Sequence, residues 1–71
     1  MSTSALVAAN IRAEMARKGS SQRALAAALE MSPTAISKRL SGRTPIDLDE
    51  LGKIAQFLDM PAERLLATDA A

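Results

Sequence analysis

Two helix-start signals that lie close together in the chain, Ser21-Gln22 and Ser32-Pro33, constrain the fold most strongly. Ser is a favoured N-cap, and Pro is favoured at the first helical position because its missing N–H would have no partner there. Between the two signals, the sequence QRALAAALEM leaves room only for one short helix and a very short connection. We therefore predict helices over residues 22–29 and from Pro33 to about Ser41, joined by a tight turn.

Other start and stop signals divide the rest of the chain into three more short helices. Gly19 is a natural stop for a helix over residues 4–18, and the sequence DLDE, with Glu50 three residues after Asp47, is typical of a capping box. That box begins a helix over residues 48–58, and Pro61 begins a last one over residues 61–66. The apolar residues expected to face the core repeat at helical spacing: Val7, Ile11 and Met15; Leu25 and Leu29; Ile36 and Leu40; Leu48, Leu51, Ile54 or Ala55, and Leu58; Leu65 and Leu66.

The composition favours an all-α fold of closely packed helices. The chain has 15 alanines but only one valine and one phenylalanine, and no apolar–polar alternation of a strand. We expect one compact five-helix domain over residues 1–71, with a frayed tail over residues 67–71.

Several kinds of chemistry lack their usual residues. The chain has no Cys, His, Tyr or Trp, which removes disulfides, the commonest general base and the commonest zinc ligand. We expect no enzymatic activity, no metal, no cofactor and no small-molecule ligand. No apolar run is long enough for a membrane span, and the first residues do not resemble a signal peptide, so we expect a cytoplasmic location without a membrane partner.

The charge is unevenly distributed, although the net charge is only +1. Residues 1–46 hold seven cations and two anions, whereas residues 47–71 hold two cations and six anions. The stretch MSPTAISKRLSGRT within residues 31–46 contains three cations and no acid. Such an asymmetry indicates an anionic partner for the basic half.

The segment SQRALAAALEMSPTAISKRLSGRTP resembles the lambda-repressor-like (Cro-type) helix-turn-helix family. The positions that match its pattern are Gln22, Leu25, Ala26, Leu29, Ser32, Ile36, Ser37, Gly42 and Pro45. The resemblance covers about residues 5–66, with the helix-turn-helix at about 22–41. One residue departs from the pattern: Glu30 stands in the turn where the family usually has Gly.

The resemblance implies that the third helix reads the major groove of double-stranded DNA. The implied base-contacting residues are Ser32, Pro33, Thr34, Ala35, Ser37 and Lys38. The implied backbone-contacting residues are Gln22, Arg23, Arg39, Ser41, Arg43 and Thr44. Arg39 also fits a second role, with its stem lying across Leu40. We interpret Arg12, Arg17 and Lys18 as solubilising charges on the first helix.

The function that the resemblance implies is sequence-specific transcriptional regulation by a small phage-repressor or Cro-like protein. Two copies are expected on a palindromic operator, as a homodimer that forms in solution or only on DNA, and Met60, Leu65, Leu66 and the tail are candidate interface residues. An antitoxin-type protein-interaction module with the same fold is the alternative, since the acidic second half suits a basic partner. A non-specific architectural or RNA-binding role is a third possibility. The lack of aromatic residues that could stack on bases argues against binding to single strands.

Overall fold

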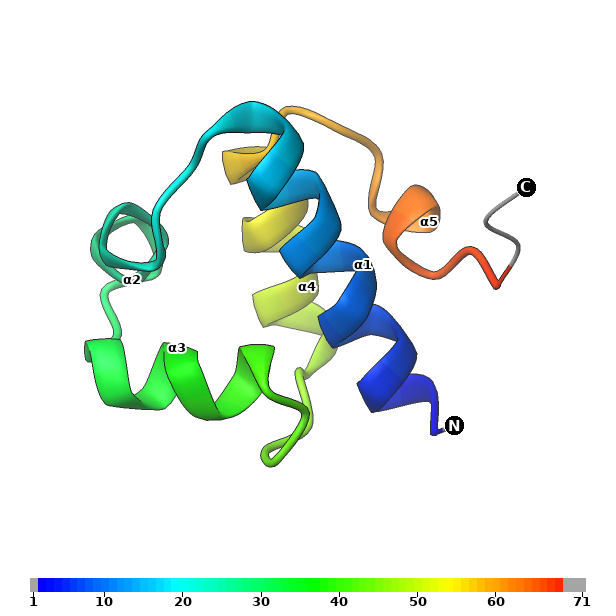
Figure 1. Cartoon of the computed structure of the whole chain (residues 1–71), viewed down its shortest axis with the longest axis horizontal. Helices are drawn as coiled ribbons and strands as arrows, with labels where there is room; N and C mark the ends of the chain where they lie inside the picture. The colour runs from blue at the N-terminus through cyan, green and yellow to red at the C-terminus, as the bar shows by residue number, and fades with distance from the viewer. Residues whose placement is uncertain (1, 69–71) are drawn as a thin grey trace.

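Five short helices follow one another in the structure, a computed structural model that describes residues 2–68. They are α1 (Thr3–Lys18), α2 (Gln22–Leu29), α3 (Pro33–Leu40), α4 (Leu48–Phe57) and α5 (Ala62–Leu65), as Figure 1 shows. The described residues contain no strand, so the all-α prediction is confirmed, and no predicted helix end differs from the observed one by more than one residue. The last part of the tail that we expected to fray, residues 69–71, lies outside the described residues.

Each of the first four helices begins with a side-chain cap. The hydroxyl oxygens of Ser2, Ser21 and Ser32 accept a hydrogen bond from the backbone N–H three residues later, at 3.0–3.1 Å. At α4 the predicted capping box is present: Asp47 accepts from the Glu50 N–H at 2.7 Å, and Glu50 accepts from the Asp47 N–H at 3.2 Å. These bonds satisfy N–H groups that a helix cannot pair internally, which fixes where each helix starts.

The same four helices end in a left-handed residue. That residue is Gly19 after α1, Glu30 after α2, Gly42 after α3 and Asp59 after α4, with φ between 56° and 83°. At each helix end, the N–H of the left-handed residue and the N–H of the residue after it donate back to carbonyls of the last turn, which is the Schellman pattern. After α2, for example, the Met31 N–H donates to the Ala26 carbonyl at 2.9 Å and the Glu30 N–H to the Ala27 carbonyl at 3.2 Å.

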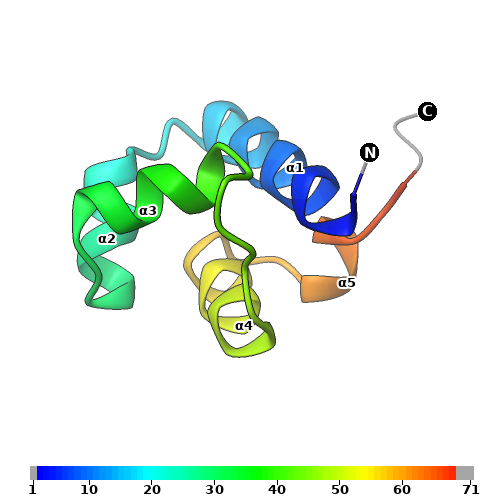
Figure 2. The ribbon, with the colours of Figure 1, turned by 90° about the horizontal axis from the view of Figure 1, so that it is seen from below.

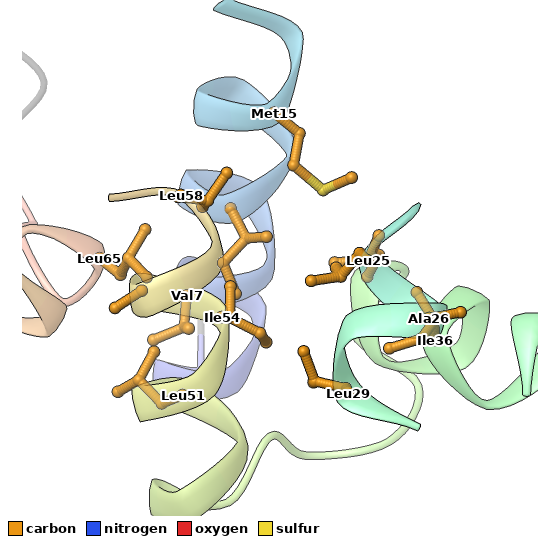
Figure 3. Close-up of a cluster of buried hydrophobic side chains, with 13 residues drawn as sticks. Val7, Met15, Leu25, Ala26, Leu29, Ile36, Leu51, Ile54, Leu58 and Leu65 are labelled. Atoms are coloured by element: carbon orange, nitrogen blue, oxygen red, sulfur yellow. The ribbon is translucent and has the colours of Figure 1, made fainter. Parts of the chain in front are cut away.

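The core is apolar throughout and draws on all five helices. Figure 3 shows Val7 and Met15 of α1, Leu25, Ala26 and Leu29 of α2, Ile36 of α3, Leu51, Ile54 and Leu58 on or next to α4, and Leu65 of α5 converging. Met31 and Met60, which directly follow the left-handed Glu30 and Asp59, pack against this cluster as the Schellman pattern favours. No polar or charged residue among residues 2–68 is buried.

Ala26 lies where α2 meets α3, and its small side chain permits this approach. The residue is only 3% exposed, and α2 packs against both α3 and α4. α1 packs against α3 and α5, and α4 packs against α5. Figure 1 shows α3 along the lower edge of the molecule, with α2 seen end-on above its start, and in Figure 2, seen from below, α2 lies behind α3. None of the helices within residues 2–68 has the length and apolar character needed to cross a membrane.

Two predictions of core residues are wrong. Leu48, which fits the apolar period of α4, is 82% exposed because it lies in the first turn, before α4 reaches the core. Ile46 of the preceding loop packs against the core instead. In α5 only Leu65 is buried, at 0% exposure, whereas Leu66 follows the helix end and is 42% exposed.

The left-handed backbone conformation of Glu30 leads to a prediction about the stability of the fold. Glu30→Gly should raise the free energy of unfolding by about 0.5–1 kcal/mol, because a Cβ is disfavoured at φ 56°. Urea unfolding measures this change. Glu30→Ala is the matched control, since it removes the carboxylate but keeps the Cβ. If the Ala variant were as stable as the Gly variant, the charge rather than the backbone would account for the gain.

Candidate nucleic-acid interface

One side of α3 forms an exposed polar stripe. Pro33, Thr34, Ser37, Lys38 and Ser41 are exposed and recur at the spacing of one helix face, while Ile36 and Leu40 are 1% and 2% exposed on the other side. This burial holds the helix against the core, so the direction of the stripe is fixed by the fold. The stripe carries a cation and hydroxyl groups but no carboxylate.

The six predicted base-contacting residues do not all lie on this stripe. Pro33, Thr34, Ser37 and Lys38 do. Ser32 is exposed just before the helix, where its hydroxyl accepts the Ala35 N–H at 3.1 Å. Ala35 is half-buried toward the flank of α3. A surface of short side chains around one lysine results.

The segment after α3 folds back onto the carbonyl of Lys38. That oxygen accepts from the Ser41 hydroxyl at 2.9 Å, the Arg43 N–H at 3.0 Å and the Thr44 N–H at 3.2 Å. Gly42 makes this turn with φ 83°, and a Cβ on it would lie 3.8 Å from the backbone of Ala5. Four of the predicted DNA-contacting residues, Lys38, Ser41, Arg43 and Thr44, are thereby gathered at the end of α3.

The start of α2 reaches the same surface. Gln22, the first residue of α2, is exposed and lines an open hollow together with Ser37 and Ser41 of the stripe. Arg23, the next residue, is also exposed. The structure therefore joins the beginning of α2 to the second half of α3.

Arg39 lies apart from this surface and makes bonds within the protein. Its Nε donates to Glu50 Oε1 at 3.0 Å, and its Nη1 donates to the Ala35 carbonyl at 3.1 Å. The Arg39 and Glu50 side chains are only 20% and 17% exposed. Because Glu50 also completes the α4 capping box, this ion pair ties α3 to the start of α4.

The charges of α1 differ from one another in their surroundings. Arg17 pairs with Glu14 of the same helix at 3.1 Å, and Lys18 Nζ donates to the Leu58 carbonyl at the end of α4. Arg12 Nη1 donates to the Leu40 carbonyl and lies in the hollow with Gln22, Ser37 and Ser41. No local sequence pattern indicates that Arg12 lies close to these residues, because this proximity depends on how α1 packs against α3. Within residues 2–68 no group of three His, Cys, Asp or Glu residues is arranged to hold a metal ion.

Comparison with known proteins gives one match. A family model described as helix-turn-helix matches residues 11–65, a range that includes α2, α3, α4 and α5 and the second half of α1. No curated protein and no solved structure gives a significant match to the chain. The matched range covers every predicted DNA-contacting residue.

The position of Arg39 predicts a structural rather than a surface role. Arg39→Met keeps the aliphatic stem but loses the bonds to Glu50 and Ala35, so it should lower the free energy of unfolding by about 1 kcal/mol. Arg43→Met is the control, because Arg43 is exposed and its stability effect should be close to zero. Equal urea midpoints for Arg39→Met and the wild type would show that the ion pair contributes nothing.

Proposed function

Because the chain belongs to the lambda-repressor-like (Cro-type) helix-turn-helix family, a family of DNA-binding transcriptional regulators, we propose that it recognises specific sequences in double-stranded DNA with α3. The observation that carries this proposal is the exposed stripe of α3. It is free of acids, fixed in direction by the buried Ile36 and Leu40, and flanked by residues able to bind phosphates.

The stripe suits the major groove, which is wide enough for a helix and displays a different pattern for each base pair. Lys38 is long enough to donate to guanine O6 or N7, and the Thr34 methyl can pack on a thymine methyl. Ala35, half-buried, offers less of its methyl group. With so few long side chains, discrimination at each base pair is expected to be modest.

Backbone contacts supply most of the affinity in this proposal. Gln22 lines the hollow with Ser37 and Ser41 of the stripe, and the exposed Arg23 follows it in α2. Ser41, Arg43 and Thr44 gather around the Lys38 carbonyl at the end of α3. Arg39 is the weakest member of this set, because a phosphate would have to compete with Glu50 for its guanidinium. Binding is expected to weaken steeply with salt, as it does when cations release counterions from DNA.

We further propose that two copies bind a palindromic operator about one helical turn apart, in a repressor or Cro-like role in the cytoplasm of a bacterium or a phage-infected host. Of the interface residues considered from the sequence, Leu65 is wholly buried within the protein and is removed from that set. Leu66 and Leu48 are the exposed large apolar residues of the described chain. Sedimentation of the protein with and without operator DNA measures whether the dimer needs DNA.

The antitoxin-type alternative is supported by a different surface. Asp47, Asp49, Asp59 and Glu63 are all exposed, as is Leu48, so the second half of the chain offers acids beside an apolar residue. A partner protein that co-purifies with the chain, and that is lost when Asp49 and Leu48 are replaced, would favour this function.

Selection from a random DNA library tests the leading proposal. A preferred sequence should emerge and should bind at moderate salt in the presence of competitor DNA. If no selected sequence binds better than the competitor, the proposal of sequence-specific recognition is wrong.

Lys38 and Arg43 should affect binding differently. Lys38→Ala should weaken binding to the preferred DNA by about 1–3 kcal/mol and relax the preference at one base pair. Arg43→Ala should weaken binding to all DNA sequences alike. It should also reduce the slope of log affinity against log salt concentration by about one unit, as loss of a phosphate contact does. Titrations at several salt concentrations separate the two effects. Wild-type binding by both folded variants would mean that DNA lies on another face.

A further inference from the structure

Arg12 occupies a position that a solubilising charge would not need. It directly follows Ile11, which is 0% exposed, so its backbone is fixed at the surface of the core. One N–H of its guanidinium donates to the carbonyl of Leu40, the last residue of α3. A long and otherwise mobile side chain is thus held against α3, leaving its other N–H groups available to a ligand.

The hollow beside Arg12 has the polarity of an anion site. Arg12, Gln22, Ser37, Leu40 and Ser41 line an open space of about 330 Å³ between α1, α2 and α3. A second hollow next to it shares Arg12, Gln22 and Leu40. No carboxylate lines either one.

Arg12 also has no carboxylate partner among residues 2–68. Glu14, the acid nearest to it in sequence, pairs with Arg17, and Glu50 pairs with Arg39. The positive charge of Arg12 therefore has no ion-pair partner within the described residues, whereas Arg17 of α1 and Arg39 of α3 each have one. An uncompensated guanidinium beside an amide and two hydroxyls matches the donors that a phosphodiester accepts from.

The hollow is continuous with the proposed DNA-reading surface. Ser37 and Ser41 belong both to the exposed stripe of α3 and to the wall of the hollow. A duplex with α3 in its major groove would therefore carry one of its backbones past this hollow.

We propose that Arg12 binds a DNA phosphate in the hollow formed with Gln22, Ser37 and Ser41, and that the Leu40 carbonyl orients its guanidinium for this contact. The inference rests on the proposed DNA-binding function and adds to it a contact from α1. It replaces the interpretation of Arg12 as a solubilising charge.

The test compares Arg12→Ala and Arg12→Lys with Arg17→Ala, on the DNA sequence selected for the wild type. Arg17 is the matched control, because it lies on the same helix and is exposed, but pairs with Glu14. Arg12→Ala should lower affinity on the order of tenfold and reduce the salt slope by about 0.9. Arg12→Lys should keep the slope and lose part of the affinity, and Arg17→Ala should match the wild type.

A second measurement protects the test from a loss of stability, since Arg12 also bonds to Leu40. Single uncharged methylphosphonates are placed along each strand of the selected DNA. At one position the methylphosphonate should weaken DNA binding by the wild type on the order of tenfold. The same methylphosphonate should weaken binding by Arg12→Lys less and should not change binding by Arg12→Ala. This coupling reports a contact with a particular phosphate, which a purely structural role would not produce.

The outcomes separate this inference from the proposed function. If Lys38→Ala weakens binding while Arg12→Ala keeps the wild-type slope and shows no coupled phosphate, only the role of Arg12 is wrong. If Arg12→Ala does not fold, the folded Arg12→Lys variant decides whether Arg12 contacts a phosphate. A methylphosphonate that weakens its binding less than it weakens binding by the wild type supports the contact, and an equal loss at every position contradicts it. If the wild type binds no DNA, both proposals fail together.

Discussion

The left-handed residue that ends each of the first four helices is the constraint on which the fold depends. Such a residue reverses the chain within two or three positions while pairing the last carbonyls of the helix. Because the reversals are so tight, even helices as short as α2 and α3 can pack on one core. Two of the four positions are not Gly, so Glu30 and Asp59 hold a conformation that their Cβ atoms disfavour. The packing of the partly buried Met31 and Met60 against the core, directly after these two residues, helps to offset that cost.

The same constraint shapes the candidate interface. At the end of α3 the left-handed Gly42 turns the chain so that the Lys38 carbonyl collects three donors. The backbone of two loop residues, Arg43 and Thr44, is thereby held at the end of the stripe, next to Ser41. A residue with a Cβ at position 42 would strain this turn, because its φ of 83° disfavours a side chain, although the Cβ would make only ordinary contact with Ala5 of α1. The local helix end and the shape of the binding surface are therefore one structural feature.

Signals within a few residues of one another predicted the fold well, whereas contacts between helices could not be predicted. Ser21, Ser32 and the Asp47–Glu50 box placed the helix starts, because caps act over three residues. The stripe of α3 followed from the same kind of periodicity. Leu48 was misplaced because periodicity gives the face of a residue but not whether the core extends to that turn. The Arg39–Glu50 pair and the approach of Arg12 to Leu40 join separate helices, and no local pattern encodes them.

These long-range pairs also explain how a chain of net charge +1 can present a basic surface. Glu14 and Glu50 neutralise Arg17 and Arg39, and Lys18 lies against the Leu58 carbonyl. Five cations among residues 2–46 are exposed without an ion pair: Arg12, Lys18, Arg23, Lys38 and Arg43. Lys38 belongs to the stripe of α3, and Arg12 borders it at Ser37 and Ser41. The backbone bond from Arg43 to the Lys38 carbonyl holds Arg43 at the end of the stripe. Internal pairing thus selects which charges act at a distance, so the direction of the field is set by the packing of the helices rather than by the total charge.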